Sequence, residues 1–300
     1  MRRLTANQFY ADAESFDLAR ECDFFSSLKM RNGTFKFTRA SRFASLDGRM
    51  AQLLRAHAGN IREVLDIGAS TGVTTVELAD FLSGEKVDAK ITATDLFVEA
   101  HLVALGPHIR VLADGEGWPL QYDLAGRAVR AWVRRLDYVS LMCLPRQLAR
   151  TRLQPYLRGK IEAGRSVPVR METRSLASHG ITLVENDIFV PTTFLTGRFD
   201  FIRAANVLNR GYFSDRQIEL ALANIRAYCR GPGALVLIIR SGSRDHDGTM
   251  FELDPRGRFE LRARIGEGSE IERLVLSLAP KQDTLRARSE HVGSPAFQRR

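Results

Sequence analysis

The chain has 300 residues, of which 44% are hydrophobic and 26% are charged, and its formal net charge is +9. This composition is that of a globular protein with a sizeable core, and it excludes a disordered or fibrous chain. No uncharged run exceeds ten residues, far short of the roughly 20 that cross a bilayer, and the first residues form no apolar signal sequence. We therefore expect a cytoplasmic protein.

The three cysteines, Cys22, Cys143 and Cys229, lie far apart and form no C-x-x-C pair. None of them has a neighbouring histidine. This pattern predicts neither a disulfide framework nor a metal site, so we expect core or surface thiols.

Residues 1–60 are predicted to form an N-terminal helical segment. Thr5 is expected to cap a helix that ends near Asn32-Gly33, and a second helix is expected to run from Phe43 to Leu54. Aromatic residues are dense on the first helix, and such a stripe usually indicates packing. We assign no site residue here.

The stretch from Val64 to Phe81 predicts a strand, a glycine loop and a helix. An apolar run that ends at Ile67 is typical of a buried strand, Gly68 and Gly72 bracket three small residues, and helical spacing begins at Val73. Glycines admit a ligand close to the backbone, and the unpaired N–H groups of a helix start point out of such a loop. We expect a polar ligand there.

The spacing of this loop argues against a dinucleotide fingerprint, G-x-G-x-x-G, because Ala69-Ser70 stands where the second glycine belongs. The loop instead resembles the first motif of class I S-adenosylmethionine-dependent methyltransferases, which holds the methionine part of the cofactor. The alternative is a strand–helix turn without a ligand. The resemblance implies that the cofactor contacts Asp66, Gly68, Ala69, Thr71 and Gly72.

Asp95 ends the next predicted strand, 23 residues after Gly72 (95 − 72). A carboxylate about 20 residues downstream accepts hydrogen bonds from ribose hydroxyls in nucleotide-binding folds, whichever nucleotide cofactor is bound. The alternative is a cap for the following helix. Together with the first motif, this position predicts that Asp95 and Leu96 contact the cofactor.

Residues 109–174 are predicted to be an insertion, because the next buried strand comes much later than a usual crossover allows. They contain thirteen Lys/Arg and six Asp/Glu, a net charge of +7. A small hairpin pairs 109–112 with 119–122, and a helix is expected from near Leu124. This basic, amphipathic helix is interpreted either as a lid that meets an anionic, acidic or amphiphilic partner, or as a structural lid with solvated arginines. Its apolar stripe is Trp132, Val133, Leu136, Val139 and Leu144, and its arginines are Arg130, Arg134 and Arg135.

The predicted sheet resumes at Ile181. The stretch 185–189 resembles the acidic turn that holds adenine in the same family, which implies that Asp187 and Ile188 bind the cofactor. The stretch 199–202 matches the family's fourth strand, with Ala204 as a further cofactor residue. The stretch 206–208, with the later Tyr212-Phe213, is similar to chemotaxis-receptor methyltransferases. Because position 206 is Asn rather than the Asp that opens the motif of amino-group methylases, and Ala204, Ala205 and Val207 beside it include no proline, methylation of exocyclic DNA amines is disfavoured.

The remaining elements are a helix from Ser214 to Tyr228, a strand over 234–239, and a closing antiparallel hairpin made of 259–265 and 271–278. Ligands sit beyond the carboxyl ends of strands in open α/β sheets, which selects the loops 206–212 and 241–249. The catalytic candidates are Asn206 and His246, although a loop histidine between two aspartates is commonly a solvated surface residue.

The predicted fold is an α/β protein with a doubly wound, seven-stranded, mostly parallel sheet of the Rossmann-like methyltransferase type. The methyltransferase domain comprises 61–108 and 175–280, with the basic helical lid at 109–174 inserted and a basic flexible tail at 281–300.

The predicted function is transfer of a methyl group from S-adenosyl-L-methionine to an O or N acceptor. The favoured acceptor is a small or lipid-like, acidic or amphiphilic molecule; peripheral membrane contact stays open, and nucleic acid is not favoured. The alternatives are a nicotinamide-dependent oxidoreductase and a non-catalytic Rossmann-like protein that binds nucleic acid or membrane through its insertion.

Overall fold

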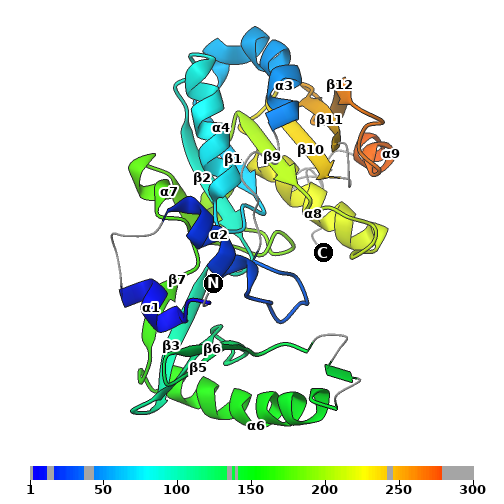
Figure 1. Ribbon diagram of the computed structural model, residues 1–300. Helices are drawn as coiled ribbons and strands as arrows, with labels where there is room; N and C mark the ends of the chain where they lie inside the picture. The colour runs from blue at the N-terminus through cyan, green and yellow to red at the C-terminus, as the bar shows by residue number, and fades with distance from the viewer. Residues whose placement is uncertain are drawn as a thin grey trace, which may run out of the picture.

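The computed structural model describes residues 3–11, 17–36, 44–133, 137–138, 141–241 and 246–278. Two β-sheets organise these residues, with the larger sheet in the upper half of Figure 1 and the smaller one below it. None of the described helices has the length and apolar character that a transmembrane span requires.

The larger sheet has seven strands in the order β12-β11-β10-β9-β1-β2-β8. Five neighbouring strands run parallel, and β11 is antiparallel to both β10 and β12. This confirms the predicted seven-stranded, mostly parallel sheet. The strands are β1 (Glu63–Ile67), β2 (Lys90–Asp95), β8 (Thr182–Glu185), β9 (Phe201–Ala205), β10 (Leu235–Ser241), β11 (His246–Leu253) and β12 (Phe259–Ile265).

Helices cover both faces of this sheet, as expected for a doubly wound fold (Figure 1). One core contains Leu54 of α3 and Leu78 of α4, and the other contains Leu222 of α8 and Val275 of α9. The elements are α3 (Ala44–His57), α4 (Val73–Gly84), α7 (Ser175–Ser178), α8 (Asp215–Tyr228) and α9 (Glu272–Ser277), with short 3₁₀ turns η1 (Ala58–Asn60) and η2 (Thr193–Leu195).

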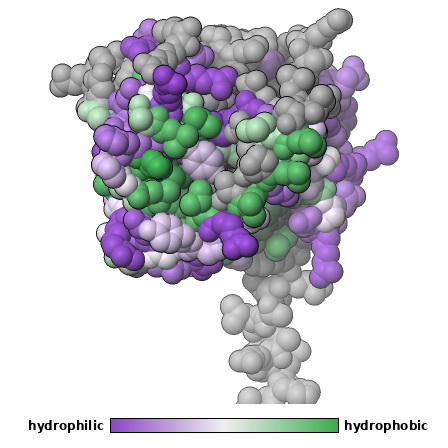
Figure 2. Space-filling model, turned by 60° about the horizontal axis from the view of Figure 1, so that its bottom comes forward, coloured by the Kyte–Doolittle hydropathy of each residue, from purple (hydrophilic) through white to green (hydrophobic). Residues whose placement is uncertain are grey.

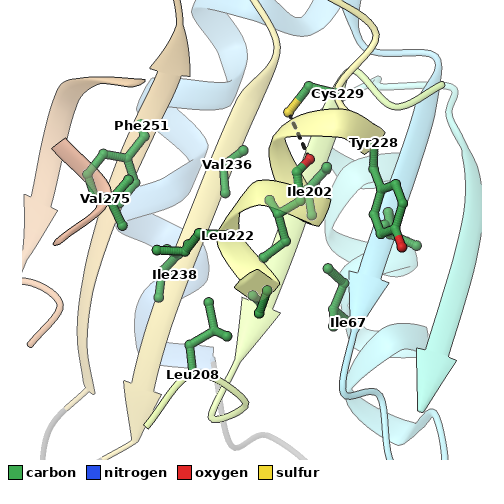
Figure 3. Packing of buried hydrophobic residues seen from close by; sticks show 14 of the residues in the cluster. Ile67, Ile202, Leu208, Leu222, Tyr228, Cys229, Val236, Ile238, Phe251 and Val275 are labelled. Atoms are coloured by element: carbon green, nitrogen blue, oxygen red, sulfur yellow. Dashed lines mark hydrogen bonds between the residues drawn. The ribbon is translucent and has the colours of Figure 1, made fainter. Parts of the chain in front are cut away.

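The core under α8 is shown in Figure 3, where Leu222 and the strand residues Ile202 and Ile238 lie together. Cys229 is part of this core, and its thiol donates a hydrogen bond to the Ile225 carbonyl oxygen at 3.4 Å. Burial raises the pKa of the Cys229 thiol to about 12, so this cysteine is a packed, unreactive thiol.

The predicted closing hairpin is wrong in its second half. Residues 271–278 do not return as a strand, because α9 occupies Glu272–Ser277 and the closing hairpin is β11 with β12. The apolar residues Ile271, Val275 and Leu278 follow one another at spacings of four and three, which places them on one face of a helix against the core.

The smaller sheet has five antiparallel strands in the order β6-β5-β4-β3-β7, and it begins before residue 109. The predicted pairing of 109–112 with 119–122 is confirmed by β4 and β5. The strands are β3 (Glu99–Gly106), β4 (Ile109–Ala113), β5 (Pro119–Leu124), β6 (Arg127–Arg130) and β7 (Val167–Arg170), and the helix between β6 and β7 is α6 (Cys143–Glu162).

The predicted helix from Leu124 is wrong, because the chain turns there and adds the strand β6. Ala125 and Gly126 form a two-residue turn with φ values of 50° and 77°, and positive φ at both positions is the conformation that joins tightly paired antiparallel strands. Trp132 and Val133 follow that strand, Leu144 belongs to α6, and Arg134, Arg135, Leu136 and Val139 lie outside the described residues.

The N-terminal residues pack on the smaller sheet. The single predicted helix is two helices, α1 (Ala6–Ala11) and α2 (Leu18–Ser26), and the Gln8 and Arg20 N–H groups donate to the capping side chains of Thr5 and Asp17 at 3.2 and 2.8 Å. Phe9, Phe24 and Phe25 share a core with one face of the sheet, while Leu157 of α6 packs on the other face. The chain start and the insertion therefore form one folded unit.

Candidate functional site

A cavity of about 600 Å³ lies at the carboxyl ends of β1, β2, β8 and β9. From β1 the chain order runs outward in opposite directions, through β2 on one side and β9 on the other, and such a switch point is where open α/β sheets bind ligands. Residues that follow these strands line the cavity, among them Gly68, Leu96, Asn186 and Asn206. Residues 30–36 line it from the other side.

The first amide groups of the glycine loop donate hydrogen bonds within the protein. The N–H groups of Gly68 and Ala69 both donate to the Thr94 carbonyl oxygen, at 2.8 and 3.0 Å. The Ser70 N–H donates to Oδ2 of Asp95 at 2.8 Å. Since these three donors are already used, they offer no cradle for a pyrophosphate group, which disfavours a dinucleotide here.

The two glycines of the loop are required by the packing of the chain itself. Gly68 has a φ of +76°, and an added Cβ would lie 2.1 Å from Cγ2 of Val207. Gly72 has a φ of +89°, and its Cβ would lie 2.6 Å from Leu176. Because of these close contacts, a larger residue at either position would disturb the packing of the protein whether or not a ligand is bound. Gly68 lines the cavity and Gly72 does not.

Asp66 supports the loop from inside the core. Its two carboxylate oxygens accept from Nε and Nη2 of Arg203, both at 2.8 Å, and Oδ2 also accepts from the Thr75 hydroxyl at 2.6 Å. Both charged side chains are only 1% exposed. Asp66 is absent from the cavity wall, as are the predicted cofactor residues Thr71, Gly72 and Ala204. Arg203, the single charge in an otherwise apolar strand, was the sequence feature that could have indicated this pair.

Asp95 lines the cavity, and a lysine that the sequence motifs did not indicate holds its carboxylate. Nζ of Lys36 lies 2.5 Å from Oδ1 of Asp95 and also donates to the Phe97 carbonyl oxygen. The Phe97 N–H donates to the same Oδ1 at 3.2 Å. Lys36 is buried, so the pair fixes the carboxylate at the cavity wall, and Oδ2 retains capacity for a further donor.

Lys36 reaches the cavity on a short hairpin, residues 28–36. The Lys36 N–H donates to the Leu28 carbonyl oxygen at 3.1 Å, which closes the hairpin. Trp132 anchors it, because its Nε1 donates to the Ser27 carbonyl oxygen at 3.0 Å and its ring lies 5.1 Å from that of Phe35. No described residue of 109–174 lines the cavity. Within the described residues the cavity is therefore bordered by this hairpin and not by the predicted helical lid.

An apolar wall lies beside Asp187. Oδ1 of Asp187 accepts from the Phe189 N–H at 2.9 Å, and Ile188 is nearly buried. The rings of Phe189 and Phe213 meet with their centroids 4.9 Å apart. All four side chains line the cavity, and together they offer a carboxylate next to a surface on which a flat ring could pack.

The two catalytic candidates are separated by the structure. Asn206 lines the cavity, with a φ of +59° that asparagine tolerates, and its N–H donates to the Ile239 carbonyl oxygen at 2.9 Å. His246 is the first residue of β11, paired with Ser241, and is not part of the cavity wall. Of the expected loop 241–249, residues 241 and 246–249 belong to the paired strands β10 and β11, and residues 242–245 lie outside the described residues.

Tyr212 lies at the cavity and is 73% exposed, so it borders the mouth. Within the described part of the chain, no three His, Cys, Asp or Glu side chains come together as metal ligands would.

Comparison with known proteins gives distant likenesses only. No family model matches the sequence, and no curated protein does. Similar solved structures include the CMeT domain of the citrinin polyketide synthase, at 15% identity and a TM-score of 0.31, over 66% of this chain and 35% of that one. The amino pentose methyltransferase CalS10 from Micromonospora echinaspora, bound to SAM, shows 12% identity and a TM-score of 0.30, over 71% and 64%.

A putative protein-L-isoaspartate O-methyltransferase from Plasmodium falciparum, in complex with S-adenosyl-L-homocysteine, shows 11% identity and a TM-score of 0.34, over 83% and 82% of the two chains. The chain spans between about a third and two thirds of the length of the first four solved structures it matches. The fold assignment therefore rests on the strand order and the position of the cavity.

Proposed function

We propose that this protein is an S-adenosylmethionine-dependent methyltransferase of class I whose cofactor occupies the cavity at the switch point. The observation that carries this proposal is that three motifs far apart in the sequence converge there. The Gly68 loop, Asp95 and Asp187 line one cavity of about 600 Å³, and they are the three positions that the family resemblance implies for methionine, ribose and adenine.

The chemistry of the cavity wall suits this cofactor better than a dinucleotide. S-adenosylmethionine carries a sulfonium and an ammonium group but no phosphate, and the wall presents Asp95 and Asp187 while the N–H groups of Gly68, Ala69 and Ser70 stay paired. Asp95 would accept from ribose hydroxyls and Asp187 from the exocyclic amine, since an ionised carboxylate only accepts. The apolar wall of Ile188, Phe189 and Phe213 would pack against adenine.

The bound cofactor supplies an electrophilic methyl group, so the protein contributes chiefly position and exclusion of water. Asn206 of the cavity wall would orient the acceptor, because its amide offers both a donor and an acceptor. An amide is no base, so a carboxylate or neutral amine acceptor fits best. Phe35 and Tyr212 border the open side, which favours an O or N acceptor with an apolar body.

Titration calorimetry with S-adenosylmethionine, S-adenosylhomocysteine and NAD tests the proposal. The variant Asp187→Asn should weaken S-adenosylmethionine binding by about 2 kcal/mol, or roughly thirtyfold, because one charge-assisted hydrogen bond is lost. The asparagine oxygen can still accept from the Phe189 N–H, so the turn should stay folded.

Asp254→Asn is the matched control. Oδ1 of Asp254 likewise accepts from the N–H two residues on, that of Arg256 at 2.8 Å, in the turn between β11 and β12 and outside the cavity wall. Wild-type affinity is expected for this control. Failure of the wild type to bind S-adenosylmethionine, or tighter binding of NAD, would refute the proposed function, and equal affinities of the two variants would remove Asp187 from the site.

A further inference from the structure

A group of large apolar side chains is exposed at the N-terminal end of α6. Leu141 and Leu144 are each 66% exposed and Leu148 is 59% exposed. Figure 2 brings the α6 side of the molecule forward and shows hydrophobic side chains gathered on it within a hydrophilic rim. We call this group the α6 patch; it consists of Tyr138, Leu141, Met142, Leu144 and Leu148.

The α6 patch is not needed to fold the helix onto its sheet. The inner face of α6 packs through Leu153, Leu157 and Ile161 against the smaller sheet. Leu144 and Leu148 are one turn apart on another face, where they are open to solvent. An apolar surface left over after folding marks an interaction site more often than chance exposure does.

Positive charge surrounds this surface. The α6 segment holds five basic residues and one acidic residue. Arg158 is neutralised by Glu116 and Glu162, at 3.1 and 2.8 Å. Arg152, one turn after Leu148, is exposed, and among the described residues it has no carboxylate within salt-bridge distance. The helix therefore presents Leu144 and Leu148 together with the unneutralised Arg152.

We propose that the α6 patch docks on an anionic lipid bilayer, with its leucines below the headgroups and Arg152 among the lipid phosphates. Charge complementarity selects this occupant, since α6 carries a net positive charge and a second copy docked on the same face would bring like charges together. The patch is mainly leucine rather than stacked aromatic rings, which argues against single-stranded nucleic acid. Leucines beside arginines on a helix surface are the combination that binds anionic membranes.

Arg130, which the sequence offered as a membrane contact, is engaged within the protein. Its Nη2 lies 2.5 Å from Oδ1 and 2.7 Å from Oδ2 of Asp137, and its guanidinium lies over the Trp132 ring. Its guanidinium is thereby committed to Asp137 and Trp132, so among the described residues the docking charge comes from α6.

Sedimentation with phosphatidylcholine vesicles, with and without phosphatidylserine, tests this proposal. The wild type should bind the anionic vesicles and lose binding as salt rises, because surface charges are screened. The double variant L144Q/L148Q should bind at least about tenfold more weakly, since both leucines lose their apolar insertion. Glutamine keeps a high helix propensity, so near-ultraviolet dichroism should be unchanged.

Two further variants test how charge contributes to vesicle binding and whether replacing an exposed leucine elsewhere has the same effect. Arg152→Gln should weaken binding at low salt and flatten its salt dependence. Leu220→Gln, at a 47% exposed leucine of α8, is the matched control and should bind like the wild type. The proposal is overturned if the wild type ignores anionic vesicles, if L144Q/L148Q and Leu220→Gln partition alike, or if the double variant only dissociates a dimer.

Discussion

At the scale of single residues, Asp66 and Arg203 form a buried ion pair in the core below the candidate site. Nη2 of Arg203 also donates to the Thr74 carbonyl oxygen at 2.9 Å, so the pair joins β1 and β9 to the start of α4. An ion pair this deeply buried is costly to break, because the remaining charge has no solvent to stabilise it.

Asp66→Asn should therefore lower the free energy of unfolding by about 3 kcal/mol or more, measured by urea denaturation. The matched surface control is Asp215→Asn, whose wild-type carboxylate also pairs with an arginine but is mostly exposed; it should change stability by less than about 1 kcal/mol. The double variant Asp66→Asn/Arg203→Met should lose less unfolding free energy than the two single variants lose together, because it leaves no unpaired charge. Equal losses at Asp66 and Asp215 would contradict the structural role assigned to the pair.

At the scale of elements, the turn between β4 and β5 contains the buried carboxyl group of Asp114. Burial is the main cause that raises the pKa of Asp114, and hydrogen bonds from the Trp118 and Glu116 N–H groups oppose it. Among the described residues its Oδ2 finds no hydrogen-bond partner, and Nε of Arg31 lies 3.9 Å from it. The turn therefore tolerates the protonated acid better than the carboxylate.

The folded state thus binds the Asp114 proton more tightly than the unfolded state does. The stability that protonation confers is fully present below the ordinary pKa of about 3.9, and it is lost as pH rises through the raised pKa. Asp114→Asn should remove this contribution and make unfolding free energy fall less steeply as pH rises from about 4, while its amide oxygen keeps the two N–H bonds. Urea denaturation across this pH range measures it, and parallel profiles for variant and wild type would contradict the prediction.

At the scale of the whole molecule, the cavity joins two folded units. Its floor comes from the seven-stranded sheet, and one wall comes from the hairpin 28–36, which Trp132 ties to the smaller sheet. A ligand in the cavity contacts both units, so binding should stabilise the whole chain rather than one part of it.

Saturation with S-adenosylmethionine at about 100 times its Kd should raise the free energy of unfolding by about 2.7 kcal/mol. Thermal unfolding should show one transition that moves upward as a unit. At the same ligand concentration Asp187→Asn should show a smaller shift, and NAD should produce none. If only one of two transitions moved, the hairpin would not couple the sheets.

The sequence alone determined the features that depend on neighbouring residues. The strand, glycine loop and helix from Val64 onward, the cap at Thr5 and the hairpin of β4 and β5 follow from local periodicity and turn chemistry. It also marked Asp95, by its place at a strand end after the glycine loop, and Asp187, by the resemblance of 185–189 to the acidic turn of the methyltransferase family.

Only the tertiary structure decided which of these residues share a surface. Lys36 meets Asp95 and Arg203 meets Asp66 across 59 and 137 positions of chain, and no local pattern encodes such a pairing. His246 lies outside the cavity wall because the pairing of β10 with β11 extends into the expected loop, as far as Ser241 and His246. The helix expected from Leu124 became a strand because the edge of β5 offered hydrogen bonds to β6. Strand pairing and the burial of charged groups depend on contacts between distant parts of the chain. They therefore determined the conformations that the local sequence left open.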